Sequence, residues 1–224
     1  MTRVDMAQKL IVEGNDAIAL ATLCKLRGLK PPLGYESPEK FKQEFVASGG
    51  GYDKALALLK LAIYQADLSN IGIIVDANDA GAATRWQAIR NILIERYSEG
   101  TLAQADGQEG PKVIKEANLP TLGIWIMPDN DGTGYLEHFL SGLVPPEEGL
   151  WAHANSVIAT LRNQPFNEIT DAKSGKALLH TWLAWKKEPG KPFGQALSAK
   201  YFDIQSPKVE PFLEWFKATF EITL

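Results

Sequence analysis

Cysteine and histidine are scarce in this sequence: its 224 residues include one cysteine, Cys24, and three histidines. A single cysteine excludes an internal disulfide and is typical of a reducing compartment. Cys24 lies among apolar residues of an expected helix, which favours a buried small hydrophobe over a reactive thiol. The histidines are too few and too scattered for a zinc motif; they are His138, His153 and His180.

Long apolar runs are also missing, since none approaches the ~20 residues that a membrane helix needs. The start, MTRVDMAQKL, lacks the apolar stretch and cleavage site of a signal peptide. We therefore expect a cytoplasmic protein with no membrane partner. The net charge of −4 gives no overall basic surface for nucleic acid. A local rim of basic residues around a metal would still be enough to bind one. The motifs GxxxxGK[ST], GxSxG, HExxH and CxxC are absent, which removes the commonest nucleotide, hydrolase and zinc interpretations.

What the sequence does contain is an alternation of short apolar runs and amphipathic segments. The runs at 9–13, 71–77 and 122–128 are typical of buried parallel strands, and 41–48 is interpreted as a further strand. The polar, glycine-rich stretch 99–111 is interpreted as a loop. This alternation predicts an α/β fold with a mainly parallel sheet, right-handed crossovers and flanking helices.

The pattern changes to helices alone after two consecutive prolines at 145–146. We expect an α/β domain over residues 1–146 and a helical extension over 147–224 that packs in the same globule. The extension carries four of the six tryptophans, and aromatics of this size more often close a core than stack on bases. The same aromatic surface leaves room for a homodimer. The four are Trp151, Trp182, Trp185 and Trp215.

Acidic side chains follow each of the three expected strands. Because ligands of parallel α/β sheets lie beyond the carboxyl ends of the strands, these residues are candidates for one site. Clustered carboxylates repel one another unless a cation lies between them, and Mg²⁺ or Mn²⁺ would relieve that repulsion. The candidates are Glu13, Asp16, Asp76, Asn78, Asp79, Asp129, Asp131 and Glu137.

Helix capping is the alternative interpretation of these acids. Asp16, Asp53 and Asp79 stand where a helix begins, and capping alone would explain them. Glu13 and Asp76 end apolar strands directly, and neither is placed to cap a helix. The glycine run at 49–51 likewise has two interpretations, a phosphate-binding loop before a helix or a tight turn.

Two of these segments resemble a known family. VEG at 12–14 and IIVDANDAG at 73–81 look like the Toprim signature of topoisomerases, primases and overcoming-lysogenization-defect nucleases. The stretch GIWIMPDNDGTGYLEHFL at 123–140 is similar to a bacterial Toprim-like family without a settled activity. The general resemblance covers about residues 8–145 and implies a Toprim-like fold.

Residue by residue, Glu13 matches the Toprim glutamate and Asp76 the first aspartate of its DxD. Asn78 replaces the second aspartate, with Asp79 next to it, and an amide brings no charge to a metal. Glu137 resembles the acid of an LE pair in the nuclease branch. The resemblance therefore implies a Mg²⁺ or Mn²⁺ site formed by these five residues.

An active site of this kind would hydrolyse a phosphodiester or transfer a phosphoryl group on nucleic acid or a nucleotide. Glu13 and Asp76 would hold the metal, with Glu13 as an alternative general base. Arg85, Lys173 and Lys176 are candidates for the cation that stabilises the transition state. Two alternatives stay open: a catalytically degenerate Toprim-like module that binds a nucleotide, nucleic acid or protein, and a purely structural partner. Strand passage is excluded, because no tyrosine nucleophile can be assigned and no gate domains are present.

Overall fold

The computed structural model describes residues 7–14, 17–29, 37–48 and 50–222, and within them the chain forms one five-stranded sheet of order β2-β1-β3-β5-β4. Four strands are parallel, and β4 pairs antiparallel with β5 at one edge. The predicted α/β architecture with a mainly parallel sheet is thus confirmed. The strands are β1 (Ala7–Val12), β2 (Val46–Ser48), β3 (Leu68–Asp76), β4 (Lys112–Ile114) and β5 (Thr121–Met127).

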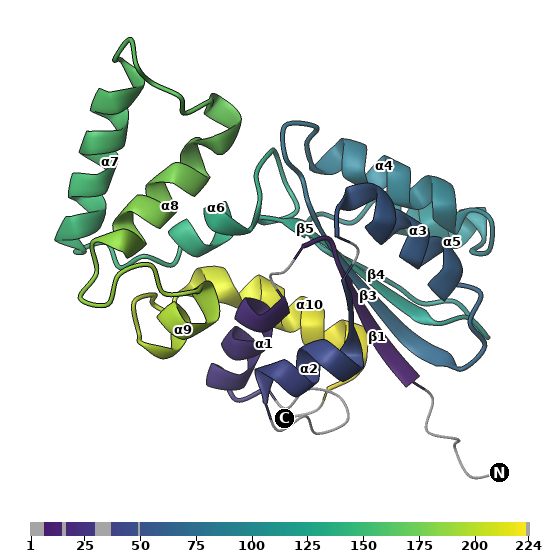
Figure 1. Ribbon diagram of the computed structural model, residues 1–224. Helices are drawn as coiled ribbons and strands as arrows, with labels where there is room; N and C mark the ends of the chain where they lie inside the picture. The colour runs from purple at the N-terminus through teal and green to yellow at the C-terminus, as the bar shows by residue number, and fades with distance from the viewer. Residues whose placement is uncertain (1–6, 15–16, 30–36, 49, 223–224) are drawn as a thin grey trace.

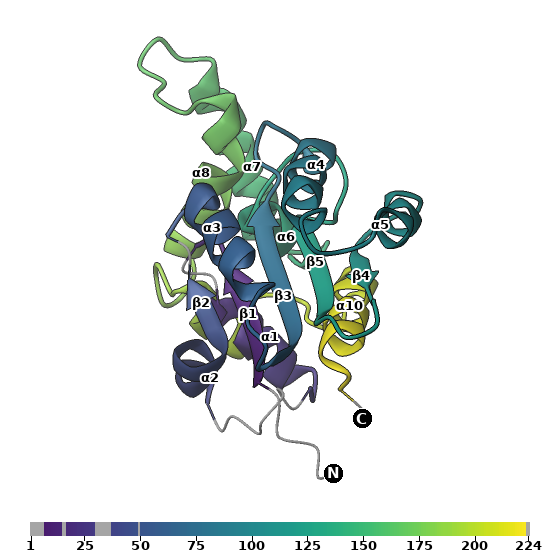
Figure 2. The same cartoon turned by 90° about the vertical axis from the view of Figure 1, so that its right-hand side faces the viewer.

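Helices cover both faces of the sheet, as Figures 1 and 2 show. One face packs against α3 (Tyr52–Ala62), α4 (Ala82–Leu93) and α5 (Glu99–Asp106). The other face packs against α1 (Ala17–Leu26), α2 (Pro38–Phe45) and α10 (Glu210–Phe220). Each layer buries its own hydrophobic cluster. The central strands are therefore apolar over most of the covered length, β3 at 71–75 and β5 at 122–127, as strands covered on both faces require.

The last helix, α10, approaches the sheet at two glycines that are neighbours on β3 and β5, Gly72 and Gly123. A Cβ placed at Gly123 would lie 1.9 Å from Thr219 Oγ1, and one at Gly72 would lie 2.7 Å from a ring carbon of Phe220. The amide of Asn70 also donates to the Thr219 carbonyl at 2.8 Å. Only glycine leaves room for a helix this close to the strands.

The remaining helices follow β5. They are α6 (Leu136–Ser141), α7 (Gly149–Arg162), α8 (Ser174–Ala184) and α9 (Phe193–Ser198), with short 3₁₀ turns at Asp171–Lys173 and Pro207–Val209. Figure 1 shows α7 and α8 side by side, projecting away from the sheet. No helix in the described ranges is long and apolar enough to span a bilayer.

The tryptophans of the extension are only partly in the core. Trp182 and Trp215 are buried, and Trp151 packs against the same cluster while half-buried. Trp185 is 38% exposed, so the expectation that all four close the core is wrong for this residue. Its ring lies beside that of His153 of α7, with centroids 5.4 Å apart and the ring planes tilted by 39°.

Two secondary-structure predictions are wrong, and helix caps explain both. Residues 41–45 belong to α2 and only 46–48 form a strand, because Ser37 caps the helix by accepting from the Lys40 N–H at 3.2 Å. Residues 99–106 form α5, which begins after Ser98 in the same way. In both segments, a serine cap outweighs the local composition.

Candidate functional site at the carboxyl edge of the sheet

The strand order creates a switch point between β1 and β3. From β1 the sheet extends to β2 on one side, and from β3 it extends to β5 and β4 on the other. Glu13 directly follows β1, and Asp76 is the last residue of β3. The backbone N–H of Asp76 donates a hydrogen bond to Glu13 Oε2 at 3.0 Å. The structure therefore places these two acids side by side, at the position where open α/β sheets bind ligands.

Backbone hydrogen bonds hold Glu13 firmly at this edge. Its N–H donates to the Ile74 carbonyl at 3.1 Å, and its own carbonyl accepts from the Gly51 N–H at 2.8 Å. Gly50 and Gly51 both have positive φ angles, 63° and 127°, and they lead directly into α3. Of the predicted glycine run, Gly49 lies outside the described residues. The turn into α3 is thus attached to the first acid of the site.

Asp76 has a second role that the sequence did not reveal. Its Oδ1 accepts a hydrogen bond from the N–H of Leu136, the first residue of α6, at 3.2 Å. A carboxylate at this position satisfies a free amide and opposes the positive end of the helix dipole. The expectation that Asp76 caps no helix is therefore wrong, because the helix that it caps begins 60 residues later in the chain.

Asn78 is held by its backbone. It adopts a left-handed conformation with φ 48°, and it forms an antiparallel bridge with Gly134 through two hydrogen bonds of 2.6 and 3.2 Å. Asparagine tolerates left-handed backbone better than most residues. This conformation is a reason for asparagine at position 78 that is independent of any metal. Its neighbour Asp79 is exposed.

Arg85 lies on α4 beneath the end of β3. Its Nε donates to the carbonyls of Asp76 and Ala77 at 3.1 and 3.3 Å, and its guanidinium lies 3.8 Å from the ring centroid of Tyr52. Arg85 therefore fixes the backbone that carries Asp76. The hydroxyl of Tyr52 is buried and has no hydrogen-bond partner among the described residues. Tyr52 is not among the residues predicted from the sequence, although its place directly after the glycine run was a usable signal.

Glu137 is buried beside a lysine of the extension. Its side chain is 7% exposed, and its Oε1 lies 3.4 Å from Lys176 Nζ. The backbone N–H of Lys176 donates to the Tyr135 hydroxyl at 3.2 Å, and its ammonium lies 5.3 Å from the centroid of the same ring. The start of α8 is thus attached to the start of α6, next to the cap made by Asp76. Lys173 is exposed.

The five residues expected to bind a metal are only partly brought together. Glu13 and Asp76 are in contact, but within the described part of the chain no three His, Cys, Asp or Glu side chains are grouped as a metal centre. Asp16 lies outside the described residues. Asp129 and Asp131 are exposed in the turn after β5, where Asp129 Oδ1 accepts from the Asp131 N–H at 3.2 Å. What the structure shows at this edge is the Glu13 carboxylate on the backbone of Asp76, without a closed metal cage in the described ranges.

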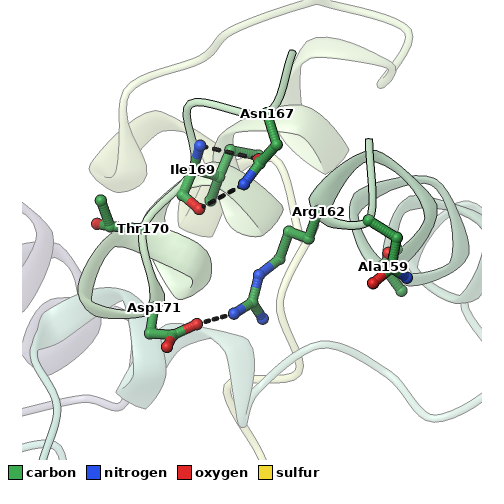
Figure 3. Close-up of a pocket in the computed structure, with 7 residues that line it drawn as sticks. Ala159, Arg162, Asn167, Ile169, Thr170 and Asp171 are labelled. Carbon is green, nitrogen blue, oxygen red and sulfur yellow. Dashed lines mark hydrogen bonds and ion pairs between the residues drawn. The ribbon is translucent and has the colours of Figure 1, made fainter. Parts of the chain in front are cut away.

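A pocket at the outer end of α7 is not part of this edge (Figure 3). Arg162 forms an ion pair across it with Asp171, and Asn167 exchanges two hydrogen bonds with Ile169 at 2.9 and 3.1 Å. The Asp171 side chain is 93% exposed. This pocket contains no strand-end residue and no buried charge, so we do not consider it a candidate for the site.

Comparison with known proteins identifies the family. No curated protein and no solved structure matches the chain. One family model matches residues 7–221, from the first residue of β1 to the end of α10. The strand ends, α6 and the helical extension therefore all lie within the matched region. On that match, the chain belongs to the family described as "Protein of unknown function (DUF3226)".

Proposed function

We propose that the chain is a Toprim-like protein that binds Mg²⁺ or Mn²⁺ at Glu13 and Asp76 and acts on a phosphodiester or phosphoryl group of a nucleic acid or nucleotide. The observation that carries the proposal is the 3.0 Å hydrogen bond from the Asp76 N–H to Glu13 Oε2 at the switch point of the sheet. The resemblance at 12–14 and 73–81 names these same two acids. Sequence signature and strand order thus support one location.

The donor set suits a weakly held Mg²⁺. Magnesium usually keeps several waters and is bound by one or two carboxylates together with substrate phosphates. Glu13 accepts a backbone hydrogen bond through Oε2, and a carboxylate has about four lone-pair positions, so Glu13 can accept this bond and face a cation as well. Asn78 would add a neutral amide oxygen. A bound divalent cation would polarise the phosphoryl group and favour hydroxide as the nucleophile.

The surrounding side chains position this edge. Arg85 fixes the end of β3, and Glu137 holds Lys176 at the start of α8. The Lys176 side chain is 52% exposed, and its ammonium is paired with Glu137 at 3.4 Å. In the proposed reaction Lys176 supplies positive charge to the phosphoryl oxygens. Arg85 acts through the backbone that it holds, and we regard it as a positioning residue.

A non-catalytic binding module is the second candidate function. In the described residues no third acid joins Glu13 and Asp76, and Asp76 already caps α6. Both facts favour a site that recognises a phosphate-bearing partner without cleaving it. The fold and the two acids would then be retained for structure and recognition.

Calorimetric titration with Mg²⁺ and Mn²⁺, combined with cleavage assays on labelled DNA and RNA, distinguishes the two functions. The enzyme proposal expects metal binding and metal-dependent cleavage, with both lost in Glu13→Gln. Glu214→Gln, at an exposed position of α10, is the matched control and should behave as wild type. Metal binding without cleavage would support the binding module. If neither metal binds and Glu13→Gln changes nothing, the metal proposal is wrong.

A further inference from the structure

A second pocket lies one strand away from Glu13 and Asp76. Its volume is about 660 Å³, and it is lined by residues of α4, β5, the turn after β5 and the segment from α5 into β4. The turn after β5 connects it to the candidate site. Gly132 of this turn accepts from the Ala82 N–H at 2.7 Å, and Gly134 forms the bridge with Asn78. One short loop therefore borders both the pocket and the strand ends.

Part of the pocket lining is apolar. It consists of Ile124 and Ile126 of β5, both almost fully buried, and of Trp86 of α4, whose ring centroid lies 5.2 Å from Lys112 Nζ. The indole N–H of Trp86 donates to Asp106 at 2.8 Å, and Asp106 is held in turn by Arg90 Nε at 3.0 Å. The orientation of the ring is thus set before any ligand binds. Such a surface suits a planar ring better than a sugar, whose hydroxyls would face the two isoleucines.

A buried donor in the pocket lining has no partner. Asn130 Oδ1 accepts from the Ile126 N–H at 2.7 Å, which fixes the side-chain amide, whereas Asn130 Nδ2 is buried without a hydrogen bond among the described residues. Buried polar groups are nearly always hydrogen-bonded. Because this atom is closed to solvent in the structure, we expect a ligand acceptor to reach it only on a small shift of the turn after β5.

The charges of the lining argue against a phosphate inside the pocket. Asp129, Asp131 and Glu109 contribute three carboxylates against the single ammonium of Lys112. Burial lowers the pKa of Lys112, and its Nζ donates to the Gln108 carbonyl at 2.7 Å. A ligand that suits this lining is neutral, donates to carboxylates and accepts from an amide and an ammonium.

We propose that this pocket binds a nucleobase that carries an exocyclic amino group, as adenine, guanine and cytosine do. These bases are planar and neutral, and they present donors and acceptors on the same edge. The idea that this base belongs to a nucleotide, with its phosphate at Glu13 and Asp76, rests on the proposed function. The binding of the base in the pocket does not rest on it.

Nucleosides test the pocket without the phosphate. Wild-type protein labelled with 5-fluorotryptophan is titrated with cytidine, uridine, adenosine and inosine, and the ¹⁹F resonance of Trp86 is assigned with Trp86→Phe. We expect cytidine to bind about tenfold more tightly than uridine, and adenosine more tightly than inosine, because only the first of each pair has the amino group. Equal binding of all four nucleosides, or of none, would overturn the proposal.

Variants locate the binding. Asn130→Asp keeps the acceptor for Ile126 but loses the Nδ2 donor, and we expect about tenfold weaker binding of cytidine. Ala83→Leu fills the pocket and should abolish binding. Gln87→Leu, at an exposed position of the same helix outside the pocket, is the control and should bind as wild type. Unchanged cytidine binding in both Asn130→Asp and Ala83→Leu would place the base elsewhere and refute the proposal.

The final comparison separates this inference from the proposed function. Cytidine monophosphate with Mg²⁺ should bind more tightly than cytidine, and Glu13→Gln should remove only that additional affinity. If cytidine binds but neither phosphate nor Mg²⁺ adds affinity, the pocket stands and the metal proposal fails. If Mg²⁺ binds at Glu13 while no nucleoside binds, the metal proposal stands and the pocket inference fails.

Discussion

Replacing Asn78 by aspartate separates the charge of this position from its backbone role. Asn78 is left-handed and bridged to Gly134, and aspartate also tolerates this conformation, so the bridge should persist. The new carboxylate adds negative charge at the edge that already holds Glu13 and Asp76. Without divalent cations the charges repel, and we expect a lower melting temperature than for wild type.

Magnesium should reverse this loss. If the new carboxylate raises the Mg²⁺ affinity about tenfold, the additional binding free energy is ~1.4 kcal/mol. A ligand that binds only the native state stabilises it by mass action. For a chain of this size 1 kcal/mol corresponds to about 2–4 °C. Saturating Mg²⁺ should therefore raise the melting temperature of Asn78→Asp by ~3–6 °C more than it raises that of wild type.

Thermal unfolding followed by circular dichroism over a series of Mg²⁺ concentrations is the assay. Asn78→Gly keeps the left-handed backbone without charge, so its Mg²⁺ dependence should not exceed that of wild type. Asn78→Ala should lose about 1–2 kcal/mol at every concentration, because alanine strains this conformation. Glu13→Gln should abolish the Mg²⁺ dependence in either background. If Asn78→Asp responds to Mg²⁺ no more than Asn78→Gly, position 78 does not face a cation, and the match to the Toprim DxD is wrong.

Three further predictions test the structure away from Asn78. Gly123→Ala should lower the free energy of unfolding measured in urea by about 1–3 kcal/mol, because the new methyl group would collide with α10. The control is Gly100→Ala, whose methyl group meets nothing within 4 Å and should not lower the free energy of unfolding. Burial raises the pKa of Cys24 to about 12, so a thiol reagent should label it only at the rate of unfolding, and immediate labelling of native protein would contradict its burial. The hydrogen bond from Lys186 lowers the pKa of Glu148, so this pair stabilises the fold above the unfolded-state pKa and stops doing so as the pH falls through the folded-state value. Urea midpoints measured against pH should thus fall more steeply on acidification for wild type than for Glu148→Gln, and identical acid limbs would refute the assignment.

The long elements were predictable from local pattern. The apolar run at 71–77 lies almost entirely within β3, and that at 122–128 contains most of β5, because strands covered on both faces must be apolar throughout. The segments at 41–48 and 99–111 were misread for a local reason. In each segment a serine caps the first turn and stabilises a helix, which the composition of the segment alone does not predict.

By itself, the sequence determined that acids follow the buried strands, and hence that an α/β sheet would carry them on one edge. It could not determine which acids meet. That depended on β1 and β3 being neighbours, which brings Glu13 to the backbone of Asp76. The cap that Asp76 provides for α6 and the approach of Lys176 to Glu137 are likewise contacts between segments far apart in the chain. Local periodicity reports only which side of an element is buried, whereas partners across the sheet are selected by the packing of the whole fold.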